Sequence, residues 1–306
     1  MKKIITVTVG ICALNEEKGI QTVIKSVLSQ VGDNFRLKKI HVISDGSSDR
    51  TVERVLAIKD KRIVLVQGKT RLGMNTRLNQ IFNQLTTDVL VKLDADILPS
   101  SPHLIARLVA PFSDPKVAFI SGKLIAVPPS SFIEKAINSG RYVWDKIRTN
   151  AATKNKVYCC AGPVYALSQS FAKISQFPKD VWADIGYLYF NAISHDLKFH
   201  YVPSAQVWIH PPTTLSDHIN QITRYDGESK PLYKYFSKDM LDMAYTIPIH
   251  QIIKFKLMAL AKYPLHTLSL LLINAYAKYL YKGKTSNIRS NWDMITSSKK
   301  THRSHH

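Results

Sequence analysis

Two aspartates with carboxylates two positions apart follow an apolar stretch near residue 90. Residues 89–93 read Val-Leu-Val-Lys-Leu, and Asp94 and Asp96 come directly after them. Such a run is typical of a strand buried on both faces of a parallel sheet, and continued strand geometry would put both carboxylates on the same side. Neighbouring carboxylates repel unless a cation lies between them, and hard divalent metals prefer oxygen ligands. The spacing predicts a metal site, with a polar turn that caps a following helix as the alternative.

Strands and helices alternate through the N-terminal part of the chain. The pattern predicts strands at 5–11, 39–44, 63–66 and 89–93, with helices after Asn15 as N-cap and at 51–58 and 74–85. This alternation implies a parallel sheet with helices on both faces. In such sheets ligands bind outside the carboxyl ends of the strands. A nucleotide site is therefore expected where the first two loops meet Asp94, although the sequence has neither a glycine-rich dinucleotide loop nor a Walker A loop.

The second half of the chain is less regular. Residues 131–150 are predicted to form a helix, 198–210 to form strands interrupted by Pro203, and a further helix to follow Pro211-Pro212. Asp184 lies between them among aromatic residues. From the residues alone, Asp184 is compatible with a helix N-cap.

Composition narrows the class of protein. The chain has 306 residues, and its hydrophobic content of 45% is sufficient for a core. Its 3 cysteines give no disulfide framework, so a reducing compartment is predicted. The formal net charge of +20 favours polyanionic partners. Because the basic residues recur around the apolar C-terminal stretch and no nucleic-acid-binding motif is present, a membrane surface is favoured and no nucleic acid is expected.

The C-terminal region is apolar but interspersed with lysines. Pro264 divides residues 249–281 into two predicted helices. A membrane-spanning helix needs about 20 apolar residues, which is longer than any clean run here. We therefore expect amphipathic helices in the membrane interface, at the cytoplasmic face, with an ordinary helical hairpin as the alternative. The predicted organisation is an α/β domain at 1–240, an apolar helical appendage at 241–283 and a basic tail at 284–306.

The order and spacing of five short stretches resemble the motifs of the inverting nucleotide-sugar glycosyltransferases of family 2. They are Ala13-Leu14-Asn15-Glu16, Asp45-Gly46-Ser47-Ser48-Asp49-Arg50-Thr51, Leu93-Asp94-Ala95-Asp96, Asp184 and Gln221-Ile222-Thr223-Arg224-Tyr225. The second stretch is the most specific of the set. The resemblance implies the GT-A fold, an α/β fold with a Rossmann-like, mostly parallel central sheet flanked by helices, here followed by the C-terminal helical appendage.

The resemblance also assigns roles in binding the donor nucleotide. Ala13 and Glu16 would edge the uracil and the ribose. Asp45 would accept a hydrogen bond from the uracil ring, and a carboxylate suits an imide N–H. From the residues alone, Asp45 is also compatible with an ordinary Asx turn.

A second group of residues would bind the metal. Asp94 would contact the ribose or the metal through its shell, and Asp96 would ligate the Mg²⁺ or Mn²⁺ that bridges the diphosphate. His210 would be a further metal or phosphate contact, with a structural histidine as the alternative.

The resemblance places the remaining residues at the reacting centre. Asp184 occupies the position of the family's general base, although Ala183 stands where the family has an acid. Gln221 and Arg224 lie at the positions that close over the donor diphosphate, and the planar guanidinium suits that group. Tyr225 replaces a tryptophan on the acceptor side. The alternative for this last motif is a solvated polar helix face.

Taken together, the resemblance implies a metal-dependent enzyme that moves a sugar from a UDP-sugar to a hydroxyl of a carbohydrate or lipid-linked acceptor, in cell-surface glycan or glycolipid synthesis. A transferase adding one sugar is favoured over a polymerase that exports its product. One alternative is a sugar-phosphate nucleotidylyltransferase, which normally has a glycine-rich basic loop after the first strand. The other is a basic lipid-binding or nucleic-acid-binding protein, which would leave the aspartates without a role.

Overall fold

The structure is a computed structural model that describes residues 4–150, 155–182, 184–227 and 230–281. The chain divides into two compact units. Of the described residues, those in 4–125 and 160–209 form the first unit, and those in 126–159 and 210–281 form the second. The units thus interleave along the chain. The division at 240 and 283 stays a prediction, and the tail predicted at 284–306 lies outside the described residues.

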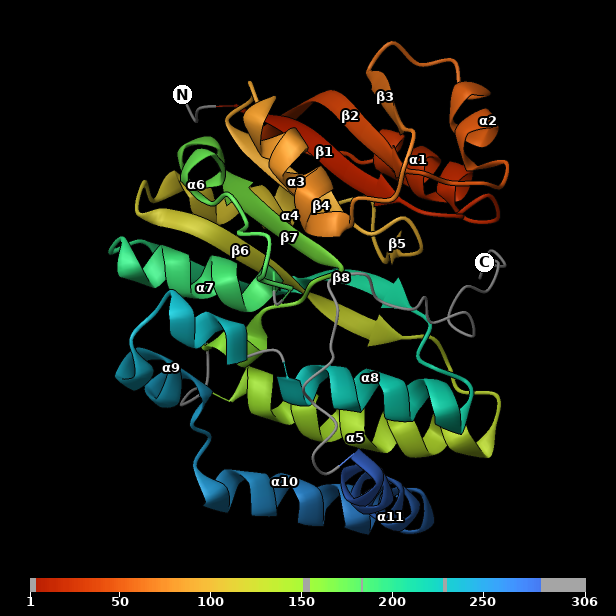
Figure 1. Ribbon diagram of the computed structural model, residues 1–306, viewed down its shortest axis with the longest axis vertical. Helices are drawn as coiled ribbons and strands as arrows, with labels where there is room; N and C mark the ends of the chain where they lie inside the picture. Colours follow the sequence, from red (N-terminus) through yellow and green to blue (C-terminus); the bar gives the residue numbers. More distant parts are fainter. Residues whose placement is uncertain (1–3, 151–154, 183, 228–229, 282–306) are drawn as a thin grey trace. The chain divides into compact units, whose positions relative to one another are not determined.

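A mixed sheet organises the first unit, with its described strands in the order β3-β2-β1-β4-β7-β6-β8-β5 (Figure 1). The N-terminal strands β1 to β4 pair in parallel with one another, whereas β7 pairs antiparallel with β4 and β6, and β5 pairs antiparallel with β8. The strands are β1 (Ile5–Ala13), β2 (Phe35–Asp45), β3 (Ile63–Gly68), β4 (Val89–Leu93), β5 (Leu98–Pro99), β6 (Val117–Ala126), β7 (Val164–Ser168) and β8 (Lys198–Ile209).

Helices lie on both faces of the parallel strands. The helices of this unit are α1 (Ile20–Leu28), α2 (Thr51–Leu56), α3 (Met74–Asn83), α4 (Leu104–Val109), α6 (Gln169–Ile174) and α7 (Asp184–Ser194), with a 3-10 turn at Ala110–Ser113. Val7 and Ile11 of β1 pack in one core with α1 and α4. Gly10 faces the other side, where an added Cβ would lie 3.2 Å from Ile81 of α3. Lys92 is the register partner of Gly10 on β4, so its side chain enters the same covered face and is fully buried.

The α/β architecture predicted from the sequence is confirmed, and two local predictions are wrong. α1 begins at Ile20 rather than directly after Asn15, because Asn15 has a φ of 54° and Gly19 is the residue before the helix. β8 continues through Pro203 without interruption. Pro203 and Ser204 are exposed there, so the missing N–H of the proline removes no bond from a covered part of the sheet.

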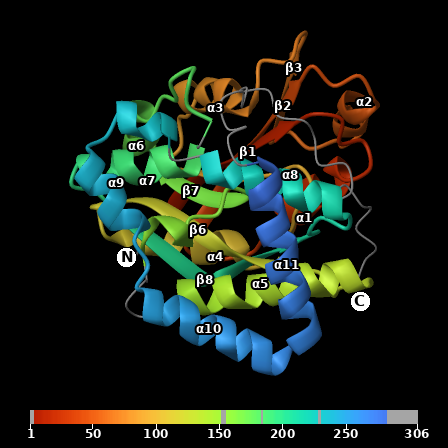
Figure 2. The same ribbon diagram turned by 60° about the horizontal axis from the view of Figure 1, so that its bottom comes forward.

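The second unit is helical. Its helices are α5 (Phe132–Thr149), α8 (Leu215–Gly227), α9 (Lys238–Tyr245), α10 (Ile249–Lys262) and α11 (Pro264–Tyr281), with 3-10 turns at Val157–Cys159 and Lys230–Lys234. α5 begins with a capping box between Ser131 and Glu134. It contacts α10 and α11, and α11 also contacts α8 (Figure 2). Pro264 separates α10 from α11 as predicted. Among the helices described, none combines the length and the apolar character needed to cross a membrane.

Candidate functional site

The loops that follow β1 and β2 are joined by hydrogen bonds. The side-chain oxygen of Asn15 accepts a bond of 2.9 Å from the Ser48 N–H, and the Glu16 N–H donates to the Thr51 hydroxyl at 2.7 Å. Ala13 is the last residue of β1 and is buried. The structure therefore brings Ala13 and Glu16 to the carboxyl edge of the sheet, beside the loop after β2.

Asp45, the last residue of β2, is held by groups from the connection between β3 and α3. Arg77 Nε donates to its Oδ1 at 2.7 Å, and the N–H groups of Leu72 and Gly73 donate to it at 2.8 and 2.9 Å. The side chains of Asp45 and Arg77 are 7% and 5% exposed, so they form a buried ion pair. A carboxylate offers about four acceptor positions. Among the described residues the three donors named here leave one position of Asp45 for a further N–H.

Two glycines allow the backbone to lie close to this ion pair. Gly46 has a φ of +76°, and an added Cβ would lie 2.9 Å from the Arg71 nitrogen. At Gly68 a Cβ would lie 2.0 Å from Arg77 Nη2. Only glycine is unstrained at the first position, and a side chain at the second would displace the guanidinium from Asp45.

β4 supplies a buried ammonium group to the acidic edge. Nζ of Lys92 donates to Oδ1 of Asp94 and, at 2.7 Å, to the Gly162 carbonyl. Burial by itself lowers the pKa of Lys92, but the carboxylates of Asp94 and Asp184 outweigh it, and the pKa is raised above its ordinary value. Lys92 is therefore a fixed cation at neutral pH, close to two of the predicted site residues.

Asp184 reaches this cluster from the first turn of α7. A carboxylate is favoured at that end of a helix by the exposed N–H groups and the helix dipole. The residue is only partly buried. Its position beside a fixed cation and its partial access to solvent suit a group that accepts a proton from a ligand.

Two neutral groups complete the floor of the cluster. Tyr165 of β7 is the register partner of Lys92, whose ammonium lies 5.5 Å from the centre of its ring. Burial, followed by the charge of Asp184, holds the pKa of the Tyr165 phenol well above its ordinary value. Burial raises the pKa of the Cys12 thiol to about 12, with Lys92 opposing and Asp94 adding to the shift. Residues from β1, β4, β7 and α7 thus influence one another around one point.

Asp94 and Asp96 lie in the turn after β4, which ends at Leu93. The strand alternation expected to align them therefore stops before Asp94. Within the described ranges, no three His, Cys, Asp or Glu residues form a group that would hold a metal unaided. The donor set still fits Mg²⁺ or Mn²⁺, because Mg²⁺ commonly binds through one or two carboxylates and takes its other oxygens from phosphates and water.

The second unit carries the remaining predicted residues. His210 lies in the segment before α8, and Gln221 is partly buried on α8. Arg224 and Tyr225 also belong to α8, but their side chains lie outside the part that the structure describes. The roles of these residues toward the donor and the acceptor stay predictions.

Arg77, Lys92 and Tyr165 are buried polar residues of this site that the sequence patterns do not single out. Two of them could have been recognised in the sequence as charged residues at apolar positions. Arg77 lies four residues before Ile81 on the buried face of α3, and Lys92 interrupts an apolar strand. A charge at an apolar position of a periodic pattern indicates a buried ion pair, because such side chains are rarely buried unpaired. Tyr165 gives no signal, since tyrosine is common in strands.

Comparison with known proteins gives the family and the fold. The profile described as "Glycosyl transferase family 2" matches residues 8–174. Poly-beta-1,6-N-acetyl-D-glucosamine synthase of Staphylococcus aureus (strain COL) is 27% identical over 245 residues, which are 76% of this chain and 57% of the synthase. The chain thus spans less than two thirds of the length of that relative.

Two solved structures share the fold. Mannosyltransferase PcManGT from Pyrobaculum calidifontis, in complex with GDP-Man and Mn²⁺, has a TM-score of 0.60 at 17% identity and covers 89% of this chain and 75% of its own. TarS 1-349 of S. aureus, in complex with UDP, has a TM-score of 0.51 at 14% identity and covers 72% of this chain and 64% of its own. The GT-A fold implied by the sequence is therefore confirmed.

Proposed function

The chain belongs to glycosyl transferase family 2, and we propose that it is a metal-dependent inverting enzyme. It would move a sugar from a UDP-sugar to a hydroxyl of a carbohydrate or lipid-linked acceptor, in the synthesis of a cell-surface glycan or glycolipid. The observation that carries this proposal is the gathering of Asp45, Asp94 and Asp184 at the carboxyl edge of one sheet, with Lys92 paired to Asp94 and close to Asp184.

The geometry around Asp45 supports uracil as the base. The named donors leave the carboxylate one acceptor position, and its other contacts fix it in place. Uracil presents a single imide N–H on its pairing edge, whereas guanine presents a ring N–H next to an amino group. One acceptor position suits the single donor, and so we expect UDP to bind better than GDP.

The turn after β4 would bind the diphosphate through a divalent cation. Asp96 would ligate it, while Asp94 keeps its hydrogen bond to Lys92 and contacts the ribose or a water of the metal shell. When bound, the metal neutralises charge on the leaving diphosphate. The structural neighbours solved in complex with Mn²⁺ or with UDP support this assignment.

The proposed reaction is a single displacement. The acceptor oxygen forms its bond to the anomeric carbon while the bond from that carbon to the diphosphate oxygen breaks, and UDP leaves with the electron pair. Asp184 takes the proton of the acceptor hydroxyl. No covalent enzyme intermediate is needed, and the configuration at the anomeric carbon inverts.

The C-terminal helices support attachment to a membrane surface. Neither α10 nor α11 contains an acidic residue, and the basic residues of the two helices include Lys254, Lys256, Lys262 and Lys278. Their large apolar side chains that are more than half exposed include Ile249, Ile253, Leu257, Leu265, Leu268 and Leu272. Apolar side chains among lysines bind the interface of anionic bilayers. We propose peripheral binding to the cytoplasmic face, where nucleotide sugars and anionic headgroups would both be available.

Calorimetric titration with UDP tests the proposal most directly. UDP should bind in the presence of Mn²⁺ or Mg²⁺, bind more weakly with excess chelator, and bind better than GDP or ADP. Asp96→Asn should abolish the metal-dependent part, whereas Asp114→Asn, a variant of an exposed carboxylate in the same unit, should bind as the parent does. Equal binding by Asp96→Asn would remove Asp96 from the metal site, and no nucleotide binding in any condition would refute the proposed donor.

Asp184→Asn separates binding from chemistry. Its UDP affinity should stay nearly unchanged, while the turnover of UDP-sugar with an acceptor should fall by roughly 100-fold or more, the usual size of general-base catalysis. Turnover is measured as UDP released from a panel of UDP-sugars and acceptors. If the Asn variant keeps its turnover, the base lies elsewhere.

A further inference from the structure

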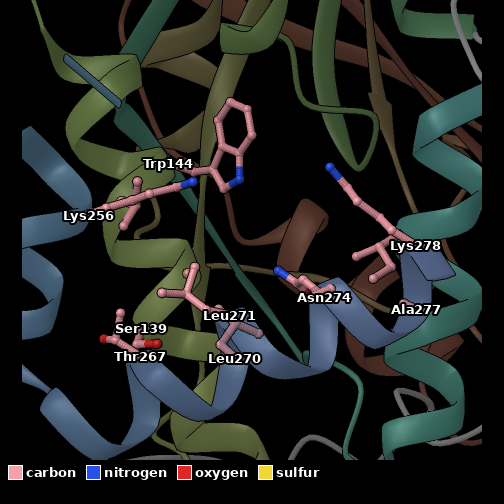
Figure 3. A pocket seen from close by; sticks show the side chains of 13 residues that line it. Ser139, Trp144, Lys256, Thr267, Leu270, Leu271, Asn274, Ala277 and Lys278 are labelled. Atoms are coloured by element: carbon pink, nitrogen blue, oxygen red, sulfur yellow. The ribbon is translucent and has the colours of Figure 1, made fainter. Parts of the chain in front are cut away.

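The second unit contains a cavity that the proposed sugar transfer does not use. Its volume is about 350 Å³, and it is bordered by α5, α8, α10 and α11 (Figure 3). Aliphatic side chains from three of these helices form much of its wall, among them Val143, Ile222, Leu270 and Leu271. A cavity of this size is within the usual range of small-ligand sites.

Three polar side chains in the wall are paired with protein groups. The Ser139 hydroxyl donates to a carbonyl of its own helix at 2.7 Å, and the Thr267 hydroxyl donates to a carbonyl of α10 at 3.1 Å. The Asn274 side-chain oxygen lies 3.1 Å from Nε2 of His218. Because these three groups bond to protein partners and much of the lining is aliphatic, this part of the wall favours an apolar ligand.

The size and lining of the cavity suit a hydrocarbon chain. A cavity of about 350 Å³ with an aliphatic wall accommodates a narrow, flexible alkyl chain.

The positive charge beside the cavity favours a ligand with an anionic headgroup. Lys256 of α10 and Lys278 of α11 are both exposed and both line the cavity. Figure 3 shows their side chains on the same side of the view as Trp144, with Leu270 and Leu271 on the opposite side. No acidic residue is among the described residues that line it. An anion next to the chain would therefore meet two ammonium groups without an opposing carboxylate in the wall.

We propose that this cavity binds one alkyl chain of an anionic amphiphile, whose phosphate or carboxylate headgroup is held by Lys256 and Lys278. The cavity is lined by residues other than those assigned to the nucleotide, the metal and the acceptor, so the proposal does not depend on the transferase reaction. It also differs from adsorption to a bilayer, because it requires a chain held in the cavity and a defined stoichiometry.

Titration of the full chain with dodecyl phosphate, kept below the concentration at which it forms micelles, tests the proposal. Calorimetry should show saturable binding with one molecule per chain. Inorganic phosphate should not bind, and dodecyl maltoside, which has the same chain and a neutral head, should bind at least several-fold more weakly. Ala275→Trp should abolish the saturable site, because Ala275 lines the cavity and is itself exposed enough to carry a larger side chain.

Matched variants distinguish the cavity from the outer surface. Tyr276→Trp changes a neighbouring exposed residue outside the cavity and should bind as the parent does. Lys256→Gln with Lys278→Gln should weaken binding roughly tenfold, the size expected for two exposed charge contacts. Lys254→Gln, an exposed lysine of α10 outside the cavity, should leave it unchanged.

Several results would overturn the proposal. These are unchanged binding by a folded Ala275→Trp variant, equal affinity for the neutral and the anionic amphiphile, or binding by many molecules without saturation. If Ala275→Trp does not fold, the double lysine variant decides, since both of its positions are on the surface. The Ala275→Trp variant should still sediment with anionic vesicles, because the exposed faces of α10 and α11 are intact. If the variant loses both vesicle binding and dodecyl phosphate binding, the two reflect the same surface adsorption, and a separate site is refuted.

Discussion

Removing the carboxylate of Asp94 should destabilise this protein more than removing its partner ammonium on Lys92. The two side chains form one ion pair, yet Lys92 is 0% exposed and Asp94 is 31% exposed. Asp94→Asn leaves a cation in the interior that has lost its hydrogen-bonded carboxylate and retains the Gly162 carbonyl and the charge of Asp184. Lys92→Met leaves a carboxylate that is already in contact with solvent and can be hydrated.

The solvent exposure of each side chain determines how much unfolding free energy its partner's removal should cost. Removing one partner of a buried ion pair costs about 3–5 kcal/mol. Lys92 also has a way to limit that cost, because it can release its proton: from its ordinary pKa of 10.5 this takes about 4.8 kcal/mol at pH 7. We therefore expect Asp94→Asn to lose about 3–5 kcal/mol of unfolding free energy. Lys92→Met should lose only about 1–2 kcal/mol, the cost of one lost hydrogen bond in a partly hydrated pair.

The assay is urea unfolding followed by circular dichroism, with the double variant Lys92→Met/Asp94→Asn included. The double variant has no buried ammonium at position 92, so it should be more stable than Asp94→Asn alone. Asp114→Asn breaks the exposed pair with Lys198 and serves as the control, with an expected change of about 0–1 kcal/mol.

Two outcomes would refute this reasoning. The first is that Lys92→Met is as destabilising as Asp94→Asn, and the second is that the double variant is less stable than Asp94→Asn. The pH dependence offers an independent check. In the parent the raised pKa of Lys92 keeps its stabilisation in full below pH 10.5. In Asp94→Asn the loss of the carboxylate lowers the pKa of Lys92. If it falls below 10.5, the folded state binds fewer protons than the unfolded state, and stability should rise with pH as the pH approaches 10.5.

Two further predictions concern buried groups of the first unit. Burial, aided by the charge of Lys39, lowers the pKa of His41 from 6.5 to about 4, so the unfolded state binds more protons between these values and stability should fall by about 3 kcal/mol as pH drops through them. His41→Leu should remove this slope in unfolding free energies measured at pH 7, 5 and 4, and an unchanged slope would assign it to other groups. Arg77→Met should cost about 3 kcal/mol, because Asp45 keeps its backbone donors but loses its buried cation; urea unfolding measures this, and a change below about 1 kcal/mol would show that the pair adds no net stability.

The first half of the fold could be predicted closely because its signals are local. Each helix carries its own apolar stripe and each strand its own apolar run, so these elements can be predicted from the local sequence without knowledge of distant residues. The helix predicted at 74–85 is found at Met74–Asn83, and the strand predicted at 89–93 is found as β4. The meeting of three loops at the carboxyl edge then follows from parallel pairing alone.

The second half was harder because its placement depends on contacts that are distant in sequence. β7 pairs antiparallel with β4, although about 70 residues separate them. No pattern within Val164–Ser168 specifies that partner or that direction. The same pairing brings Tyr165 to Lys92, which is why the buried floor of the site could not be derived from the sequence, whereas its acidic rim could.

Lys92 shows how a departure from a local pattern can be informative in itself. In an otherwise apolar strand a lysine is unfavourable unless the fold supplies counter-charges, and here they come from Asp94 and Asp184, which are two and about 90 residues away. A cation fixed at this point lets two carboxylates share the edge before any ligand arrives. Because it also occupies an oxygen of Asp94, we expect ligation of the divalent metal to fall chiefly to Asp96. Substitution at Asp96 should then abolish metal-dependent nucleotide binding, whereas Lys92→Met, which releases Asp94, should retain it.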